Sequence, residues 1–369
     1  MDLLENIPLA QYTTLGVGGP ARWFAETRDE QDVLAAVRFA RSHNVTFFIL
    51  GGGSNLLVSD RGFPGVVIRI ASDALAIHDF KESGTAIVEA DAGVEWDAAV
   101  RAAVEHNAAG IECLAGIPGS VGGTPVQNVG AYGQEVSHSI VSVHALDLVS
   151  EKVVHLSASD CGFSYRRSIF NTTQRNRYAI TRVVYSLKLD GPPHLEYRDV
   201  KHFFAGRANA QPTLAETADA VREIRARKGM LLATAPGAQP DPDSRSAGSF
   251  FKNPVVLAAN LPRLAVIAGR RVDEVPQFPP GSWTSTSGEM VKLSAAWLIE
   301  LAGFHKGFNA GRAGLSSKHV LAIVNRGGAT ASEIVALRDA IVDRVQAKTS
   351  IRLEQEPVTL GFPPMNSCH

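Results

Sequence analysis

The sequence predicts an α+β fold divided into two or three domains. The chain has 369 residues, and one domain takes roughly 150 residues. Hydrophobic residues make up 45 % of the chain and charged residues 20 %, which is ordinary for a soluble globular protein. Segments with helical periodicity also alternate with segments rich in β-branched residues, so helices and strands are expected throughout.

The expected helices are those in which apolar residues recur at helical spacing. Asp29 can cap the first helix, and Thr330 with Glu333 forms a capping box for the last. The helices are predicted at residues 29–43, 95–106, 214–227, 294–301 and 330–347. The strands are predicted at residues 45–50, 56–58, 66–70, 140–148, 153–156, 178–189 and 320–324, with a final strand that begins at 351–353.

Two stretches rich in proline and glycine interrupt these elements. Residues 233–246 contain three prolines and one glycine, which can continue neither a helix nor a strand. This stretch is therefore a candidate domain boundary. Residues 276–288 form the second loop-like region.

Composition excludes several classes of protein. The chain has 36 Lys and Arg against 37 Asp and Glu, so it lacks the basic field that drives non-specific nucleic-acid binding. No apolar run approaches the roughly 20 residues that span a membrane, and the N-terminus has no secretory signal. Three cysteines without C-x-x-C spacing indicate a reduced, cytoplasmic protein and no metal site.

Glycine is unevenly distributed, and this is the first indication of function. Seven of the 33 glycines fall between Gly110 and Gly133, and three more are consecutive at 51–53. Consecutive glycines let backbone N–H groups converge on an anion, because no Cβ blocks the approach. The 51–53 loop lacks the Gly-Lys-Ser/Thr of a P-loop, and taken alone it would equally suit a flexible hairpin.

A second, longer glycine loop covers residues 116–133. Small residues at positions 116, 119, 120, 122 and 123 would let its backbone lie flat against a ligand. Thr124, Gln127 and Asn128 add hydrogen-bond donors and acceptors. Two such loops from separate strands suit a long ligand with a pyrophosphate in its middle.

A third glycine segment, residues 16–21, matches G-x-G-x-x-A but is not predicted to be a Rossmann fingerprint. That fingerprint needs a buried strand before it and a helix after it. Here the strand-like residues 22–25 follow. We interpret the segment as a turn.

Motifs along the whole chain resemble those of the UDP-N-acetylenolpyruvoylglucosamine reductase (UDP-N-acetylmuramate dehydrogenase) family. They include both glycine loops and occur in the family's order over nearly the full length, so chance agreement is not credible. The motifs are TLGVGG at 14–19, LGGGSNLL at 50–57, GIPGSVGG at 116–123, QNVGAYG at 127–133, FSYRRS at 163–168, RARKG at 225–229, GSFFKNP at 248–254, AAWLIELAG at 295–303 and LEQEPV at 353–358.

The resemblance implies an FAD-binding fold of the vanillyl-alcohol-oxidase (PCMH) type in two subdomains, with a C-terminal α+β substrate-binding domain. Subdomain 1 would cover residues 1–71, with 350–369 returning to it, and subdomain 2 would cover 72–232. The PCMH-type unit itself would span about 15–190, and the substrate-binding domain 247–349. The protein would act as a monomer.

The resemblance also implies that the two glycine loops hold the FAD pyrophosphate. The FAD-binding residues would be Gly51, Gly52, Gly53, Ser54, Asn55, Gly116, Pro118, Gly119, Ser120, Gly122, Gly123, Thr124, Asn128 and Ala131. Some proteins of this fold attach FAD through His or Cys. Residues 45–60 contain neither, which favours non-covalent FAD. Cys113 is the one other candidate for attachment, and a small buried hydrophobic residue is its alternative interpretation.

The family reduces a vinyl ether that carries a carboxylate, and this chemistry needs a cation to stabilise the developing negative charge. A guanidinium presents fixed, permanently charged donors to a carboxylate. The family pattern Tyr-Arg-x-Ser selects Arg166 for this role over its neighbour Arg167. In an extended segment the two side chains would point to opposite faces, so only one of them can serve.

The reaction also needs a proton donor to carbon C2 and a group that assists it. The resemblance assigns the proton to Ser249, with Lys252 and backbone dipoles as possible helpers. It assigns to Glu356 assistance either to Arg166 or to the proton relay. Glu354 and Glu356 would share one face of a strand, so spacing alone does not choose between them. The family places this Glu about five residues before a glycine, which favours Glu356, although Pro357 departs from the family pattern.

Substrate contacts are likewise implied by the resemblance, at Tyr165, Tyr197, Lys228 and Asn253. A lysine is a suitable point charge for a diphosphate. Half-buried packing is the alternative interpretation for Tyr197, and an exposed helix end for Lys228. The partners would be the UDP-sugar and NADPH, and the preference for NADPH over NADH is implied by the family alone.

The predicted function is therefore that of a cytoplasmic, bacterial flavoprotein oxidoreductase in peptidoglycan precursor synthesis, and hence in cell-wall biogenesis, cell shape and division. NADPH, through FAD, would reduce UDP-N-acetyl-3-O-(1-carboxyvinyl)-glucosamine to UDP-N-acetylmuramate. The rival hypotheses are another flavin oxidoreductase on the same fold and a non-catalytic flavin or nucleotide-sugar binding module.

Overall fold

The computed structural model describes residues 1–207, 211–232, 239–278 and 289–363. Residues 233–238 of the expected domain boundary and 279–288 of the second expected loop lie outside the described residues, as do 364–369 of the expected returning segment. The chain forms two compact units. The first comprises Met1–Pro8, Pro20–Gly53 and Gly62–Arg227, and the second comprises Leu9–Gly19, Ser54–Arg61 and Lys228–His369.

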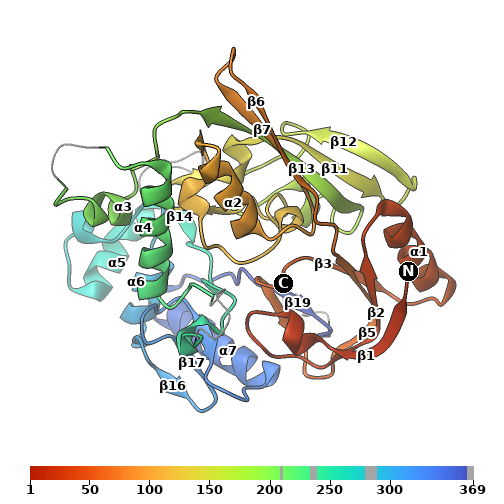
Figure 1. The fold of residues 1–369 in the computed structure, drawn as a ribbon. Coiled ribbons are helices and arrows are strands. Elements are labelled where there is room, and N and C mark those ends of the chain that lie inside the picture. The colour runs from red at the N-terminus through yellow and green to blue at the C-terminus, as the bar shows by residue number, and fades with distance from the viewer. Residues whose placement is uncertain (208–210, 233–238, 279–288, 364–369) are drawn as a thin grey trace. The chain divides into compact units, whose positions relative to one another are not determined.

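The first unit contains a four-stranded sheet in the order β1-β2-β5-β3, covered by helix α1 (Glu30–Ser42) (Figure 1). β1 and β2 pair in antiparallel fashion, whereas β5 is parallel to both β2 and β3. Asp29 caps α1 by accepting the N–H of Asp32 at 2.8 Å. The strands are β1 (Leu3–Pro8), β2 (Pro20–Thr27), β3 (Phe47–Leu50) and β5 (Phe63–Ile70).

The first unit also contains a six-stranded antiparallel sheet, in which β8 lies off the path β12-β11-β13-β7-β6. The hairpin of β6 and β7 extends beyond the rest of this sheet (Figure 1). The strands are β6 (Leu75–Phe80), β7 (Thr85–Asp91), β8 (Ala108–Ala109), β11 (Ile140–Asp147), β12 (Lys152–Ser157) and β13 (Tyr178–Leu189).

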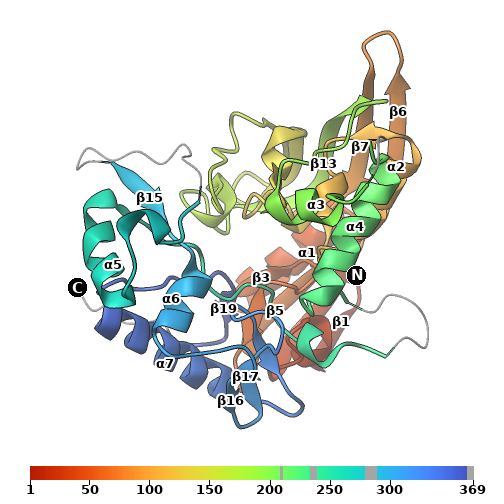
Figure 2. The same cartoon turned by 90° about the vertical axis from the view of Figure 1, so that its left-hand side faces the viewer.

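Helices α2 (Trp96–Glu105) and α4 (Leu214–Arg227) lie side by side in the first unit (Figures 1 and 2), and α3 (Arg198–Phe203) packs on α4. Trp96 of α2 and Val221 of α4 share one hydrophobic core with Tyr185 of β13. This core places α2 and α4 next to the long glycine loop, whose segment β9 (Gly130–Ala131) pairs with β10 (Gln134–Glu135).

The second unit packs three helices around its own hydrophobic core (Figure 2). The capping box predicted at Thr330 and Glu333 is confirmed, because each side chain accepts the other residue's backbone N–H at the start of α7. The helices are α5 (Leu261–Ala268), α6 (Ala295–Leu301) and α7 (Ala331–Thr349). The strands are β4 (Leu56–Val58), β14 (Val255–Leu257), β15 (Met290–Lys292), β16 (Asn309–Ala310), β17 (Ala313–Leu315), β18 (Ile323–Asn325) and β19 (Val358–Leu360).

The α+β class predicted from the sequence is confirmed, as are the positions of most predicted elements. Two strand predictions were displaced. The last strand is β19, seven residues after Ile351, and it runs parallel to β4. Ile351 and Leu353 are buried but do not belong to a strand. The alternation of apolar residues in this segment therefore reflects burial rather than strand pairing. The strand predicted at residues 320–324 is also shifted. Strand β18 begins at Ile323, and Val320 is buried but lies outside it.

The G-x-G-x-x-A segment is a turn, as predicted, because strand β2 follows it directly at Pro20. Gly18 has a positive φ of 121°, and a Cβ there would lie 2.5 Å from Cβ of Val58. Close packing on β4 therefore explains this glycine without a dinucleotide.

Candidate active site

The two glycine loops touch each other within the first unit. The short loop follows β3, and a Cβ added at Gly52 would lie 2.5 Å from Cα of Gly119 and 2.6 Å from its carbonyl carbon. A Cβ at Gly51 would lie 3.1 Å from Oγ of Ser120. Glycine is required at 52 because the two backbones approach more closely than any side chain permits. The loops thus form one continuous surface of backbone.

The long loop is fixed to the body of the first unit by its own backbone. The N–H groups of Val121 and Gly122 donate to the carbonyls of Val94 and Ala92, both at 2.9 Å. A Cβ at Gly122 would lie 2.6 Å from Cβ of Ala92, so this glycine is needed for packing. Gly123 differs, because a Cβ there would meet nothing closer than Ser120 Oγ at 4.0 Å.

The side chains of two expected cofactor residues, Thr124 and Asn128, are hydrogen-bonded to other residues of the protein. The Thr124 hydroxyl lies 2.8 Å from the phenol of Tyr185. The amide of Asn128 donates to Glu135 and to the carbonyl of Ser164, and its oxygen accepts the N–H of Ser137. These side chains shape the loop, so only their backbone remains for a ligand.

Arg166 is aimed at the long glycine loop. Its Nη2 donates to the carbonyl of Gly130 at 2.8 Å, and its guanidinium lies 5.6 Å from the ring centre of Tyr165. The segment is a tight turn closed by Ser164 and Arg167, rather than the extended chain that we expected. Arg166 has a φ of 56°, which is uncommon for a residue with a side chain and is typical of functional sites.

The two arginines of this turn differ in how far their side chains are buried. Arg166 is half-buried beside the loop, whereas Arg167 is exposed. The side-chain amide of Asn171 also donates to the carbonyl of Arg166 at 3.1 Å, which holds the turn in place. Burial and contact with the loop therefore favour Arg166, the residue that the family pattern selects.

Ser249 and Glu356 are brought together by backbone pairing in the second unit. The N–H of Glu356 donates to the carbonyl of Phe250 at 2.9 Å, and the N–H of Lys252 donates to the carbonyl of Glu354 at 2.9 Å. Ser249 immediately precedes this antiparallel pairing. Gly248 before it has a φ of 72°, so the chain turns sharply at the serine.

The same pairing distinguishes the two glutamates. The side chain of Glu354 is 73 % exposed and forms an ion pair with Lys252 at 2.5 Å. Glu356 is half-buried, and its carbonyl accepts the side-chain N–H of Asn55 at 3.3 Å. Glu354 is therefore a surface residue that occupies Lys252, which leaves Glu356 as the candidate beside Ser249.

The expected substrate residues lie on both units. In the first unit, Tyr197 caps α3, and its ring meets the ring of Tyr132 edge to face at 5.4 Å. In the second unit, Lys228 follows α4 and is half-buried. The side-chain oxygen of Asn253 accepts the N–H of Ala295 at 2.9 Å, which fixes this half-buried amide at the start of α6.

Cys113 has the environment of a structural cysteine. It is fully buried, and its Sγ donates to the carbonyl of His194 at 3.1 Å. Burial raises the pKa of the Cys113 thiol well above its usual range, with the charge of Glu112 adding to the effect. A thiol that keeps its proton is a poor nucleophile.

Among the described residues, no cluster of His, Cys, Asp and Glu could hold a metal ion.

Family models match both halves of the chain. Residues 21–157 match the FAD binding domain, and residues 239–360 match the UDP-N-acetylenolpyruvoylglucosamine reductase, C-terminal domain. UDP-N-acetylenolpyruvoylglucosamine reductase of Thermobifida fusca is 43 % identical over 97 % of this chain and 98 % of that protein. The chain belongs to the UDP-N-acetylenolpyruvoylglucosamine reductase family.

Further relatives agree with this family. The Streptomyces coelicolor reductase is 42 % identical over 97 % of this chain and 90 % of that protein. The crystal structure of UDP-N-acetylenolpyruvylglucosamine reductase from Thermus caldophilus aligns with a TM-score of 0.60 at 27 % identity, covering 97 % of this chain and 98 % of that one. The family and the FAD-binding fold predicted from the motifs are confirmed. No helix in the described ranges is long and apolar enough to cross a bilayer.

Sequence reasoning gave no role to the charged residues that hold the long glycine loop. Asp97 contacts this loop from α2, and Arg225 contacts it from α4. Arg225 belongs to the RARKG motif, which was a signal of importance without a role. Asp97 lies between apolar residues on a helix, and nothing in its spacing points to a loop 19 positions away.

Proposed function

We propose that the protein is an FAD-dependent reductase that converts UDP-N-acetyl-3-O-(1-carboxyvinyl)-glucosamine to UDP-N-acetylmuramate with NADPH. The observation that carries this proposal is the 43 % identity to a reductase of this name over nearly the full length of both chains. In the reaction the C2=C3 double bond of the enolpyruvyl group gains a hydride at C3 and a proton at C2, and NADPH is oxidised to NADP⁺.

The touching glycine loops fit a pyrophosphate, because residues without Cβ atoms let a ligand lie against their backbone. The room at Gly123 supports this fit, since a ligand rather than the protein would occupy it. The two loops would hold FAD, which would supply the transfer of a hydride from NADPH to C3 of the enolpyruvyl group. We assign its binding to the two loops, without a covalent bond, in keeping with the buried and protonated thiol of Cys113.

Arg166 binds the substrate carboxylate in this proposal. Hydride addition at C3 builds negative charge at C2, which spreads into the carboxylate. A permanently charged guanidinium stabilises that charge more strongly in the transition state than in the ground state. Its hydrogen bond to Gly130 and its packing on Tyr165 limit its motion, so the donors are oriented before the reaction.

Ser249 delivers the proton to C2, and Glu356 assists it. A hydroxyl is a weak acid, so the serine needs neighbours that hold its position and replace its proton. The backbone pairing at Phe250 keeps Glu356 next to the serine. We assign to Glu356 the orientation of the serine and the return of its proton.

We assign the UDP portion to the residues that the family resemblance selects. Lys228 and the side-chain amide of Asn253 would bind the diphosphate, as a point charge and a neutral donor. Tyr165 and Tyr197 contribute contacts to the substrate. We propose that the protein acts as a monomer. We also propose that the reaction takes place in the bacterial cytoplasm, where its soluble nucleotide substrates would be found.

The proposal is tested on the purified protein. It should be yellow, and acid precipitation should release all its flavin as FAD. NADPH oxidation followed at 340 nm should depend on the enolpyruvyl UDP-sugar. Oxidation that ignores this substrate would favour another flavin oxidoreductase, and no oxidation at all would favour a binding module.

A further inference from the structure

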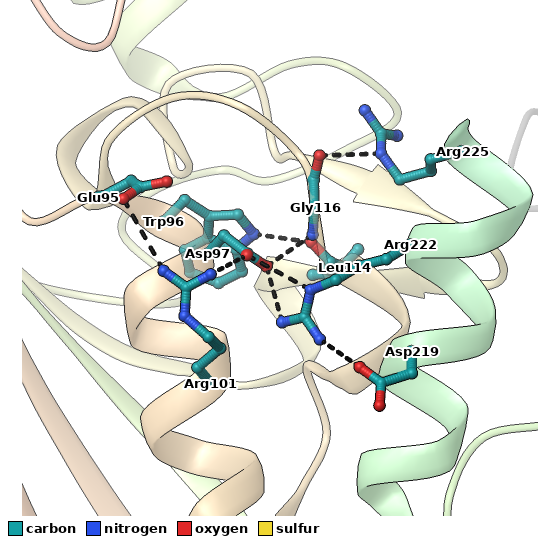
Figure 3. Close-up of polar contacts among 9 residues, drawn as sticks. All are labelled: Glu95, Trp96, Asp97, Arg101, Leu114, Gly116, Asp219, Arg222 and Arg225. Carbon is teal, nitrogen blue, oxygen red and sulfur yellow. Dashed lines mark hydrogen bonds and ion pairs between the residues drawn. The ribbon is translucent and has the colours of Figure 1, made fainter. Parts of the chain in front are cut away.

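A buried carboxylate on α2 anchors the first residue of the long glycine loop (Figure 3). Asp97 is 6 % exposed, and its Oδ1 accepts the N–H of Gly116 at 2.7 Å. Arg101 donates to its Oδ2 at 2.6 Å, and Arg222 of α4 donates to its Oδ1 at 3.0 Å. Two guanidiniums and one backbone N–H therefore converge on a single carboxylate.

The other side of the same residue is held by a buried cation. The carbonyl of Gly116 accepts Nε of Arg225 at 2.9 Å, and Arg225 is 6 % exposed (Figure 3). Two residues earlier, the carbonyl of Leu114 accepts the indole N–H of Trp96 at 3.0 Å. Gly116 has a φ of 68°, so both of its peptide planes are set by these contacts at a point where the backbone turns.

Arg225 also reaches the far end of the loop. It is hydrogen-bonded to the phenol of Tyr132, whose pKa is raised by burial and lowered in part by this guanidinium. The ring of Tyr132 in turn meets Tyr197. Asp97 and Arg225 together thus fix the loop at Gly116 and at Tyr132, which bracket the segment proposed to hold FAD.

We infer that Asp97 is a positioning residue for FAD, acting through Gly116 and with Arg222 and Arg225. It touches neither the cofactor nor the substrate. Its role is to hold the backbone of residues 116–123 in the conformation that receives the FAD pyrophosphate. This inference rests on the proposed function, because it assumes that residues 116–123 bind FAD.

The test compares Asp97→Asn with a matched control, Asp147→Asn. Asp147 is 4 % exposed, pairs with Arg177 at 2.9 Å and accepts the backbone N–H of Val149 at 2.9 Å, at the end of β11. Both variants keep the side-chain volume and remove a buried charge that pairs with arginine, namely with Arg101 and Arg222 at Asp97 and with Arg177 at Asp147. Of the two aspartates, only Asp97 is bonded to a glycine loop in the described part of the chain.

The measurement is FAD release from diluted holoenzyme, followed by flavin fluorescence, alongside the thermal midpoint of the same sample. We expect Asp97→Asn to speed FAD release about 10- to 100-fold, as for the loss of a charged hydrogen bond. Turnover at saturating FAD should stay near wild type. Asp147→Asn should lower the midpoint but change FAD release less than about twofold.

Equal changes in FAD release for the two aspartate variants would overturn the inference, because both effects would then follow from stability alone. If Asp97→Asn does not fold, Arg222→Gln replaces it, since that side chain is 21 % exposed and its guanidinium holds the Asp97 carboxylate in the orientation that accepts the N–H of Gly116. Unchanged FAD release in Arg222→Gln would then contradict the inference.

Gly123→Ala separates this inference from the proposed FAD site. The protein itself has room for a methyl group at this position. The methyl group should therefore interfere with FAD binding but not with folding. Faster release in Gly123→Ala with no change in Asp97→Asn would overturn only the role of Asp97. No change in either variant would overturn the assignment of the loop to FAD.

Discussion

The proposed cofactor region and the proposed proton-transfer region are held in place by different means. In the first unit, the glycine loops are packed against each other and tied to α2 and α4 by buried charges. In the second unit, Ser249 and Glu356 stand on two short extended segments joined by backbone hydrogen bonds. Backbone pairing tolerates changes of side chain, whereas close packing and buried charge do not.

Function and stability can therefore be separated more readily in the second unit. Substitutions around the glycine loops should change flavin retention, and those that disturb close packing or buried charge should also lower stability. Substitutions at Ser249, Glu356 or Lys228 should change catalysis or substrate binding and leave the flavin in place.

The largest effect is expected for Gly52→Ala. Its methyl group would lie 2.5 Å from Cα of Gly119, so one loop must move. Overpacking of this kind costs roughly 1–3 kcal/mol, and here the displaced backbone is the proposed FAD site. We expect the purified variant to carry almost no FAD by absorbance at 450 nm. Gly206→Ala, where a Cβ meets nothing within 4 Å, is the control and should retain full flavin.

Lys228→Ala should weaken binding of the UDP-sugar by roughly 1–3 kcal/mol, as for a lost charged hydrogen bond, without loss of flavin. The measurement is KM for the UDP-sugar together with the flavin content. Lys348→Ala, at an exposed position of α7 in the same unit, should leave both unchanged. An unaltered KM in Lys228→Ala would return this lysine to the role of a helix-end residue.

Tyr132→Phe should have a smaller effect, confined to flavin. It removes the hydrogen bond to Arg225 but keeps the ring that packs on Tyr197. A typical hydrogen bond contributes about 1 kcal/mol and Arg225 keeps its bond to the carbonyl of Gly116, so FAD release should speed up about fivefold. If KM for the UDP-sugar rises instead and FAD release stays the same, Tyr132 belongs to the substrate side of the division.

The smallest effect on function is expected from acid titration of Asp147. The Arg177 guanidinium, with backbone N–H groups, lowers the pKa of Asp147 to about 2. A carboxyl with a lowered folded pKa adds stability above its unfolded pKa and loses it as pH falls toward the folded value. The difference in thermal midpoint between wild type and Asp147→Asn should therefore be full above pH 4 and shrink as pH approaches 2. A difference that stays constant over this range would show that the charge of Asp147 contributes nothing.

Much of the fold could be predicted because local signals were strong. Helix α4 has the predicted bounds, 214–227, and α7 starts at the predicted capping box. Strand β19 was misplaced because its partner, β4, lies about 300 residues away, and pairing at that distance leaves no periodic signal. Strand β6 escaped prediction because it is exposed on most of its length and lacks a clear alternation.

The candidate site could also be predicted only in part from the sequence. The glycine loops were visible in the composition, and the motifs selected Arg166 and Ser249. The tight turn at Arg166 was not predicted, because its left-handed backbone depends on contacts such as those with Gly130 and Asn171 rather than on a local sequence pattern. Asp97 was missed because a charged residue within an amphipathic helix is ordinarily solvated. Its importance comes from Arg222 and Gly116, which reach it from elsewhere in the chain.

Proton donation from Ser249 to C2 of the substrate can be tested by following the two half-reactions of Ser249→Ala separately in an anaerobic stopped-flow instrument. Flavin bleaching by NADPH does not involve C2 and should stay near wild type. Recovery of the flavin absorbance on addition of the enolpyruvyl UDP-sugar should slow by about 10²- to 10⁴-fold, the usual contribution of a positioned acid. Ser249→Cys should recover part of this rate, because a thiol can still give a proton. Equal slowing of both half-reactions, or an unchanged recovery, would contradict the claim.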